Sequence, residues 1–204
     1  MRRLLIVLAV LALATTTFAA GKAAPKEMGM GAGAFLSYWD AKDPDDPGAG
    51  LGVLGKMEVM ENVCLQARLS LYAFTQEEDV PDAELDASVI PFEVAATYRY
   101  ALADELAVYG GGGVGYYLVD TEVDVNEPGV DIDYEVDNGF GLFLLGGGVF
   151  SLMENVGIFG EIKYTLLKLD TETTVTALGV PVFSDDDEID LSGLAVNIGA
   201  ALKF

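Results

Sequence analysis

Charged residues and the absence of histidine define what chemistry is open to this chain. None of its 204 residues is histidine, which removes the residue that most often serves as a general base or a transition-metal ligand. An unpaired buried ion costs several kcal/mol, so charges within alternating apolar and polar segments should pair, as Glu93 with Arg99 and Glu161 with Lys163. The pattern predicts a cluster of structural ion pairs, with no catalytic residue and no cofactor site. The six charged residues of this kind are Lys56, Arg68, Glu93, Arg99, Glu161 and Lys163.

Two further motifs resemble ligand sites. Asp131, Asp133, Glu135 and Asp137 alternate with apolar residues and offer carboxylate oxygens of the kind that Ca²⁺ prefers. The run lacks the glycine at the sixth position of an EF-hand loop, so we interpret it as a solvated, projecting strand, with cation binding as the alternative. Residues 110–115 match G-x-G-x-x-G, but the chain continues there as a strand, whereas a nucleotide site requires a helix.

The N-terminus has the features of a secretory signal peptide. Arg2 and Arg3 precede an unbroken apolar run at residues 4–14, and small residues follow it, with cleavage expected near Ala19 or Ala20. The run is too short to cross roughly 30 Å of hydrocarbon as a helix. We therefore expect a signal peptide at 1–20, a short N-terminal lead at 21–27, a single domain at 28–204, and export through the Sec pathway.

Apolar and charged residues must be segregated along this chain. Hydrophobic residues make up 51% of it, although the net charge is −22. That negative charge also argues against nucleic acid as a partner. Apolar residues recur at every second position, which indicates β-strands with one apolar face. Eight strands of about ten residues result, the length that a tilted membrane strand needs. The predicted strands lie near 28–38, 50–57, 63–74, 90–102, 106–119, 140–152, 156–166 and 193–204.

The connections between these strands alternate between short and long. Short turns are expected near 61–62, 103–105 and 153–155, and Val59–Val63 resembles Leu152–Val156 as a repeated hairpin unit. Long connections fall near 39–49, 75–88, 120–138 and 170–188, and they hold most of the 33 acidic residues. Outer-membrane barrels show this asymmetry, with short periplasmic turns and long external loops.

The same strands could instead form a soluble, lipocalin-like barrel. A soluble barrel would place its apolar residues inside and its polar residues outside, whereas charges such as Arg68 and Glu161 suit the narrow, filled lumen of a membrane barrel. Aromatic residues near strand ends predict interface girdles, with Tyr38, Trp39 and Tyr116 among those on the loop side. We therefore predict an all-β fold, an eight-stranded antiparallel up-and-down transmembrane β-barrel.

The sequence resembles small outer-membrane barrels of the OmpA transmembrane-domain, OmpX and OmpW type. The most specific likeness is the terminal segment, in which Asn197, Gly199, Leu202 and Phe204 resemble the family's C-terminal β-signal. The glycine-aromatic segment 108–117 and the turn at 153–155 resemble the family less specifically. The resemblance implies that the barrel-assembly machinery reads the last strand. Enzymes with this architecture rely on a catalytic histidine, so we expect no enzymatic activity here.

Two functions remain open. The first is a structural or surface-interaction protein with a plugged polar lumen and acidic external loops. The second, which the resemblance to OmpW-like barrels implies, is a narrow channel for small or apolar molecules. In either case we expect a monomer in the outer membrane of a Gram-negative-type bacterium. Its partners would be membrane lipid, the assembly machinery, and a surface partner or divalent cations at the acidic loops.

Overall fold

The structure is a computed structural model that describes residues 29–44, 46–77, 84–124, 130–177 and 180–204. Eleven strands occupy these ranges. No helix within them is long and apolar enough to cross a membrane. The predicted signal peptide at 1–20 and the lead at 21–27 lie outside the described residues.

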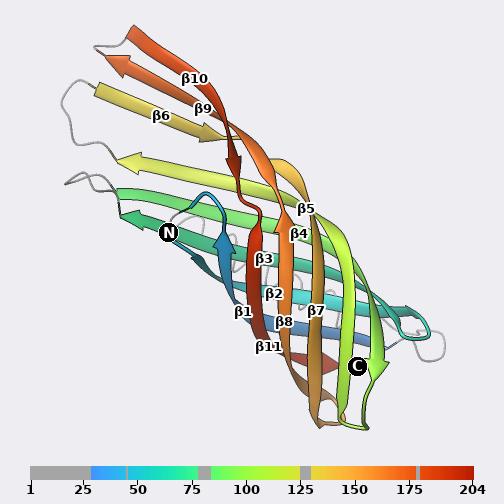
Figure 1. The fold of residues 1–204 in the computed structure, drawn as a ribbon. Coiled ribbons are helices and arrows are strands. Elements are labelled where there is room, and N and C mark those ends of the chain that lie inside the picture. The colour runs from blue at the N-terminus through green and yellow to red at the C-terminus, as the bar shows by residue number, and fades with distance from the viewer. Residues whose placement is uncertain (1–28, 45, 78–83, 125–129, 178–179) are drawn as a thin grey trace.

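Eight of the strands close into an antiparallel barrel (Figure 1). Strand β1 closes it by pairing with both β2 and β11. The predicted eight-stranded antiparallel barrel is confirmed. Its strands are β1 (Met30–Ala41), β2 (Gly48–Met60), β3 (Val63–Glu77), β4 (Glu84–Ala101), β5 (Leu106–Asp124), β7 (Gly139–Met153), β8 (Val156–Leu166) and β11 (Gly193–Lys203).

The barrel is apolar outside and polar inside. Outward side chains such as Leu36, Leu144 and Ile198 are about 70% exposed, at 71%, 70% and 68%. Inward side chains such as Glu93 and Asn197 are buried, at 2% and 0%. A soluble barrel has the opposite arrangement, so this pattern requires lipid around the sheet, where a closed sheet also pairs every backbone group.

Short turns join the strands at one end, which we call the turn end. The hairpins β2–β3 and β7–β8 share one irregularity, because the register shifts between Glu58 and Met60 in one and between Ser151 and Met153 in the other. The repeated hairpin unit predicted from the sequence therefore has a structural counterpart. At the first turn Asn62 has a φ of 65°, a left-handed conformation that asparagine tolerates better than most residues.

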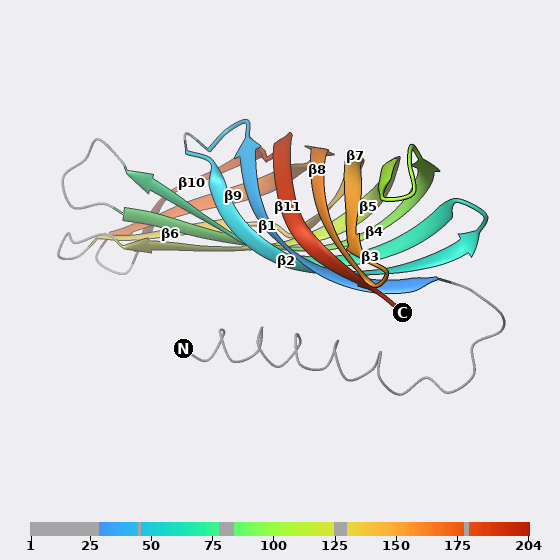
Figure 2. The same ribbon diagram turned by 90° about the horizontal axis from the view of Figure 1, so that it is seen from below.

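The opposite end, which we call the loop end, carries a second sheet that was not predicted from the sequence. Residues 170–188 were expected to be a long loop, but they belong largely to a hairpin of β9 (Lys168–Ala177) and β10 (Val180–Asp190). Strand β6 (Val130–Val136) pairs with β9 on its other side, which agrees with the projecting strand expected there. Figures 1 and 2 show these three strands extending away from the barrel wall on one side.

Candidate functional site in the barrel lumen

Four charged residues fill the middle of the lumen, and we call them the lumen plug: Arg68, Glu93, Glu161 and Lys163. Arg68 and Glu93 are direct register partners on β3 and β4. Lys163 Nζ on β8 lies 2.5 Å from Glu93 Oε1, and Arg68 Nη2 lies 2.7 Å from Glu161 Oε1. Each carboxylate thus has a cation, and the two positive and two negative charges balance. Such pairing is required because all four side chains are removed from water.

Hydrogen bonds hold both carboxylates of the plug in place. Tyr117 donates to Glu93 Oε1 at 2.9 Å. Tyr109 donates to Glu161 Oε2 at 3.1 Å, and Asn197 Nδ2 donates to Glu161 Oε1 at 2.8 Å. The register explains the second contact, because Gly147 lies between Tyr109 and Glu161 and its missing side chain leaves room for the tyrosine hydroxyl. These bonds satisfy both oxygens of Glu161 and Oε1 of Glu93. Glu93 Oε2 has no hydrogen bond among the described residues and lies 3.8 Å from Arg68 Nε.

The pairs differ from those expected from the sequence. Glu93 and Arg99 are six residues apart on one strand, which places them about 20 Å apart at 3.3 Å per residue. Glu93 instead pairs with Lys163 and Arg68. Glu161 pairs with Arg68, although Lys163 is its neighbour on the same face of β8. The expected pairs Glu93–Arg99 and Glu161–Lys163 are thus replaced by pairs that cross the lumen.

An aromatic cluster, the aromatic cap, lies in the lumen between the plug and the loop end. It consists of Trp39, Tyr72, Phe74 and Tyr117, all buried. The Trp39 ring lies 5.0 Å from that of Tyr72 and 6.2 Å from that of Tyr117, measured between centroids. Trp39 was expected in the outer girdle beside Tyr38, but alternation along β1 turns it inward, to 1% exposure. The cap therefore fills the section of lumen above the plug.

The cap is joined to the plug by a polar chain. Ser37 Oγ donates to Asn197 Oδ1 at 2.5 Å and lies 2.8 Å from the Tyr72 hydroxyl. Asn197 in turn binds Glu161. Ser37, Asn197 and Glu161 are successive register partners across β1, β11 and β8, so strand pairing alone brings them together. The plug and the cap thus form one continuous filling of the lumen.

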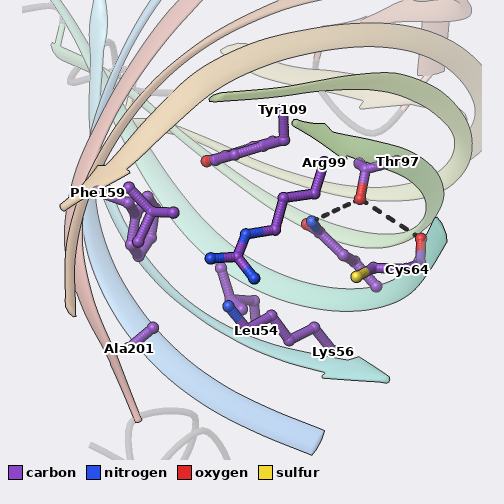
Figure 3. Close-up of a pocket in the computed structure, with 10 residues that line it drawn as sticks. Leu54, Lys56, Cys64, Thr97, Arg99, Tyr109, Phe159 and Ala201 are labelled. Atoms are coloured by element: carbon purple, nitrogen blue, oxygen red, sulfur yellow. Dashed lines mark hydrogen bonds between the residues drawn. The ribbon is translucent and has the colours of Figure 1, made fainter. Parts of the chain in front are cut away.

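The other two predicted lumen charges lie elsewhere. Lys56 and Arg99 line a pocket between the plug and the turn end, together with apolar and uncharged polar side chains (Figure 3). Among the described residues, neither of them has an ion pair. Phe159 also lines this pocket, and its ring lies 6.4 Å from that of Phe35, over which Arg68 is placed. The inner wall of the pocket therefore rests on the plug.

A polar contact ties the barrel to the hairpin at the loop end. Lys42 Nζ lies 2.7 Å from Asp190 Oδ2, and the Ser192 N–H donates to Asp190 Oδ1 at 3.0 Å. The hydrogen bond from Lys42, followed by those from Ser192, holds the pKa of the Asp190 carboxyl below its usual range. The same partner raises the pKa of Lys42. These residues fix the base of β10 against the end of β1.

The acidic run proposed as a cation site lies on or beside β6. Asp131, Asp133 and Glu135 are in this strand, but their side chains lie outside what the structure describes, and Asp137 follows it as an exposed residue. Elsewhere in the described chain, no group of three or more acidic or cysteine side chains is placed to hold a metal ion. Calcium binding at this run therefore stays a prediction.

The residues of the predicted assembly signal divide between the two faces of β11. Asn197 faces the lumen, where it binds the plug, whereas Leu202 and Phe204 are exposed at 49% and 65%. A Cβ on Gly199 would lie 2.3 Å from the Ala34 carbonyl oxygen, so only glycine fits there. Asn197 thus has a structural role in the lumen that the motif alone did not reveal.

Some members of the lumen filling were not singled out from the sequence. Tyr117, Tyr72 and Ser37 are all buried: Tyr117 contacts the plug, Ser37 contacts its partner Asn197, and Tyr72 contacts Ser37. Their positions were the available signal, because each falls on the inward-facing side of the two-residue alternation along its strand. Aromatic residues at inward positions near a charged partner are therefore the ones to look for in such sequences.

A closed antiparallel sheet with an apolar outside and a filled polar lumen defines an outer-membrane β-barrel protein. The chain belongs to the family described as outer membrane protein beta-barrel domain, whose model matches residues 5–204. Membership implies the outer membrane of a Gram-negative-type bacterium and a lipid environment for the outward face.

Solved structures of small outer-membrane proteins share this fold. OprG from Pseudomonas aeruginosa matches with a TM-score of 0.70 and 16% identity, covering 88% of this chain and 97% of that one. A major outer membrane protein from Thermus thermophilus gives 0.59 and 13%, with 86% and 98% covered. AlkL in DMPC bilayers gives 0.54 and 18%, with 90% and 94% covered. At these identities the likeness shows the fold alone, and comparison with curated protein sequences finds no match.

Proposed function

We propose that this protein is a closed barrel with a structural or surface-interaction role, and that its lumen does not conduct ions. The observation that carries the proposal is the filling of the lumen by the plug and the aromatic cap. The plug residues are at most 4% exposed, and Trp39, Tyr72 and Tyr117 are at most 1% exposed. An ion crossing this section would have to displace paired, hydrogen-bonded charges, which costs several kcal/mol.

The proposed interaction surface is the loop end, because the sheet of β6, β9 and β10 extends the barrel there. Its sequence is strongly acidic, as the run at 185–188 shows. Acidic residues at this end suit a basic partner or divalent cations that bridge to anionic headgroups. The proposed role of this surface is binding, without enzymatic activity. We also propose that the protein is exported through the Sec pathway.

Single-channel recording of the refolded mature protein tests the closed lumen. We expect no stable open current under modest voltage. A double variant, Glu93→Ser with Lys163→Ser, removes one ion pair as a unit and widens the middle of the lumen, so it should pass a current. A stable open current through the wild-type protein would contradict the proposal, provided that a heat-modifiable gel band shows the barrel to be folded.

A second function is favoured by one feature of the barrel wall. Strands β3 and β4 pair at Leu69–Phe92 and again at Tyr72–Val89, but not at the two positions between. Pro91 lies in this interval, and proline has no N–H to donate. The interval interrupts the backbone pairing of the wall between the plug and the cap, so we propose it as the place where a small apolar molecule would pass sideways into lipid. A barrel without ion current that still accelerates entry of a small apolar dye into liposomes would favour this function.

We also propose that the assembly machinery reads the last strand, with Phe204 as its terminal aromatic residue. Replacing Phe204 with alanine should lower the amount of folded protein in the outer membrane several-fold, because a recognition contact is lost while few contacts within the barrel change. Phe150→Ala is the matched control, since Phe150 is also an exposed aromatic residue near the turn end, at 41%. Equal outer-membrane levels of the two variants, measured by blotting of membrane fractions, would remove the support for this role.

A further inference from the structure

The distribution of unpaired cations singles out the turn end of the lumen. The described residues include seven lysines and arginines, in a chain with 33 acidic residues. Arg68 and Lys163 are paired in the plug, and Lys42 and Lys168 are paired with acids at the loop end. The remaining three form no ion pair within the described chain, and all three lie at the turn end. We call these residues the basic mouth: Lys56, Arg99 and Lys203.

Strand pairing brings the basic mouth together. Gly31 on β1 is the register partner of Lys203 on one side and of Lys56 on the other, so the two lysines flank a position without a side chain. The Lys56 chain lies over this glycine, because a Cβ there would be 2.8 Å from Lys56 Cε. Arg99 faces the same space from β4, and Figure 3 shows its guanidinium pointing into the pocket above Lys56.

The pocket beneath these cations is amphipathic. It is partly open to solvent. Gln66 also lines it, and its Oε1 is buried without a hydrogen-bond partner, while its Nε2 donates to Thr97 at 3.2 Å. The pocket therefore combines the ammonium group of Lys56 and the guanidinium group of Arg99 with a hydrocarbon wall. These are the features of a binding site for an organic anion. The apolar wall consists of Leu54, Val149, Phe159 and Ala201.

Two simpler explanations do not account for this arrangement. Basic residues at a membrane interface often contact lipid phosphates, and this explains Lys203, which is exposed at the rim. It does not explain Lys56 and Arg99, which line the lumen and not the outer surface. The carboxylate of Glu58 lies on the same strand face as Lys56, but it accepts a hydrogen bond from the Asn62 N–H and is not ion-paired to Lys56.

We infer that the turn-end pocket binds a small amphipathic carboxylate that enters from the turn side. The carboxylate lies between Lys56 and Arg99, and its hydrocarbon part lies against the wall formed around Leu54 and Phe159. Charge-assisted hydrogen bonds to two cations select the anion, and burial of the hydrocarbon tail against the apolar wall adds to the affinity. This site lies on the turn side of the plug and does not depend on whether the lumen conducts.

Cys64 provides a native reporter for this inference, because it is the chain's only cysteine and lines the pocket. Methanethiosulfonate reagents label thiols and are available with an anionic sulfonate or a cationic trimethylammonium group. Relative to a free thiol, Cys64 in the folded mature barrel should react several-fold faster with the anionic reagent than with the cationic one. The reason is that Lys56 and Arg99 together outweigh the single carboxylate beside the thiol, that of its register partner Glu58. Equal relative rates would overturn the inference.

The matched variants separate the basic mouth from general charge effects. Lys56→Gln with Arg99→Gln should abolish the anionic preference, whereas Lys42→Gln with Lys168→Gln removes two bases from the loop end and should preserve it. Lys56→Arg should also preserve it, which guards against a misfolded double variant. Each protein is first checked for the heat-modifiable folded band. Loss of the preference in the loop-end variant as well would contradict a local origin.

Protection experiments test the class of ligand. Hexanoate should slow labelling of Cys64 severalfold, while 1-hexanol and hexylammonium, which share the tail but not the charge, should not. Sulfate tests whether charge alone suffices, and equal protection by sulfate would overturn the amphipathic ligand. Protection by hexanoate that persists in the Lys56→Gln, Arg99→Gln variant would show partition into the apolar wall only, and would overturn the inference as well. A conducting wild-type lumen would disprove the closed barrel without changing these results.

Discussion

Replacing Arg68 with methionine should destabilise the folded barrel by about 3–5 kcal/mol, the usual effect of removing one partner of a buried ion pair. Methionine approximates the volume of the arginine chain, so the main loss is charge. Glu161 would then keep only its bonds from Tyr109 and Asn197, and Glu93 would keep Lys163. The measurement is the urea midpoint for loss of the folded gel band after reconstitution in lipid.

The control for this effect is a double variant that adds Glu161→Gln to Arg68→Met. It removes the cation and the carboxylate together and leaves the Glu93–Lys163 pair intact. Because an uncompensated charge costs more than a missing pair, the double variant should recover at least half of the lost stability. A single variant as stable as the wild type, or a double variant less stable than the single one, would show that the plug is not held by paired charge.

Replacing Gly113 with alanine should destabilise the barrel by up to about 3 kcal/mol, the upper part of the range for overpacking. A Cβ at this inward position would lie 2.1 Å from the Val94 carbonyl oxygen and 2.7 Å from Phe143 Cζ. The first obstacle is backbone, so strands β4 and β5 would have to move apart. A lower folded fraction on refolding into vesicles, or a lower urea midpoint, measures the effect.

Gly160 gives a matched control on the outward face. A Cβ there meets nothing within 4 Å. Gly160→Ala should therefore leave the urea midpoint unchanged or raise the unfolding free energy by about 0.4–1 kcal/mol, because alanine restricts the unfolded chain more than glycine does. If both glycine variants behaved alike, close approach of the β4 backbone to Gly113 would not be the reason for glycine at that position.

The fold was predictable because its signals are local. Alternation along segments such as 63–74 and 156–166 indicates strands with one apolar face, and the lengths of the connections set their order around the barrel. The same alternation predicts that Arg68, Glu93, Glu161 and Lys163 share the lumen. Which of these charges form ion pairs depends on the register between strands and on distances across the barrel. Neither can be read from the sequence of a single strand.

The ion pairs show this limit most clearly. Glu93 was matched with Arg99 because they share a strand face, whereas its partner Lys163 lies across the lumen. Trp39 was placed in the outer girdle by its neighbours in sequence, but its parity along β1 turns it into the cap. Ser37 faces the lumen opposite its register partner Asn197. Trp39 is two residues further along the same strand, so strict alternation from Ser37 would have placed it inside.

The second sheet, formed by β6, β9 and β10, was not predicted for a different reason. Residues 168–190 are rich in threonine and acidic side chains, so their composition indicates a solvated loop. Threonine and valine also favour strands, and the continuous pairing of β9 with both β6 and β10 gives the segment its structure. This pairing depends on three segments that are separate in the sequence, so the pattern within any one of them does not predict it.

The missing pairs between β3 and β4 make the barrel a ring with one weak link. In a closed cylinder every strand bears the same circumferential tension, and a strand pair separates first where its backbone bonds are interrupted. Rupture would then start beside Pro91, where the thirteen register partners of β3 and β4 are interrupted, and not at the closure between β1 and β11, where the eleven partners are continuous. The chain ends meet at a strong joint, and the point of failure lies near the middle of the sequence.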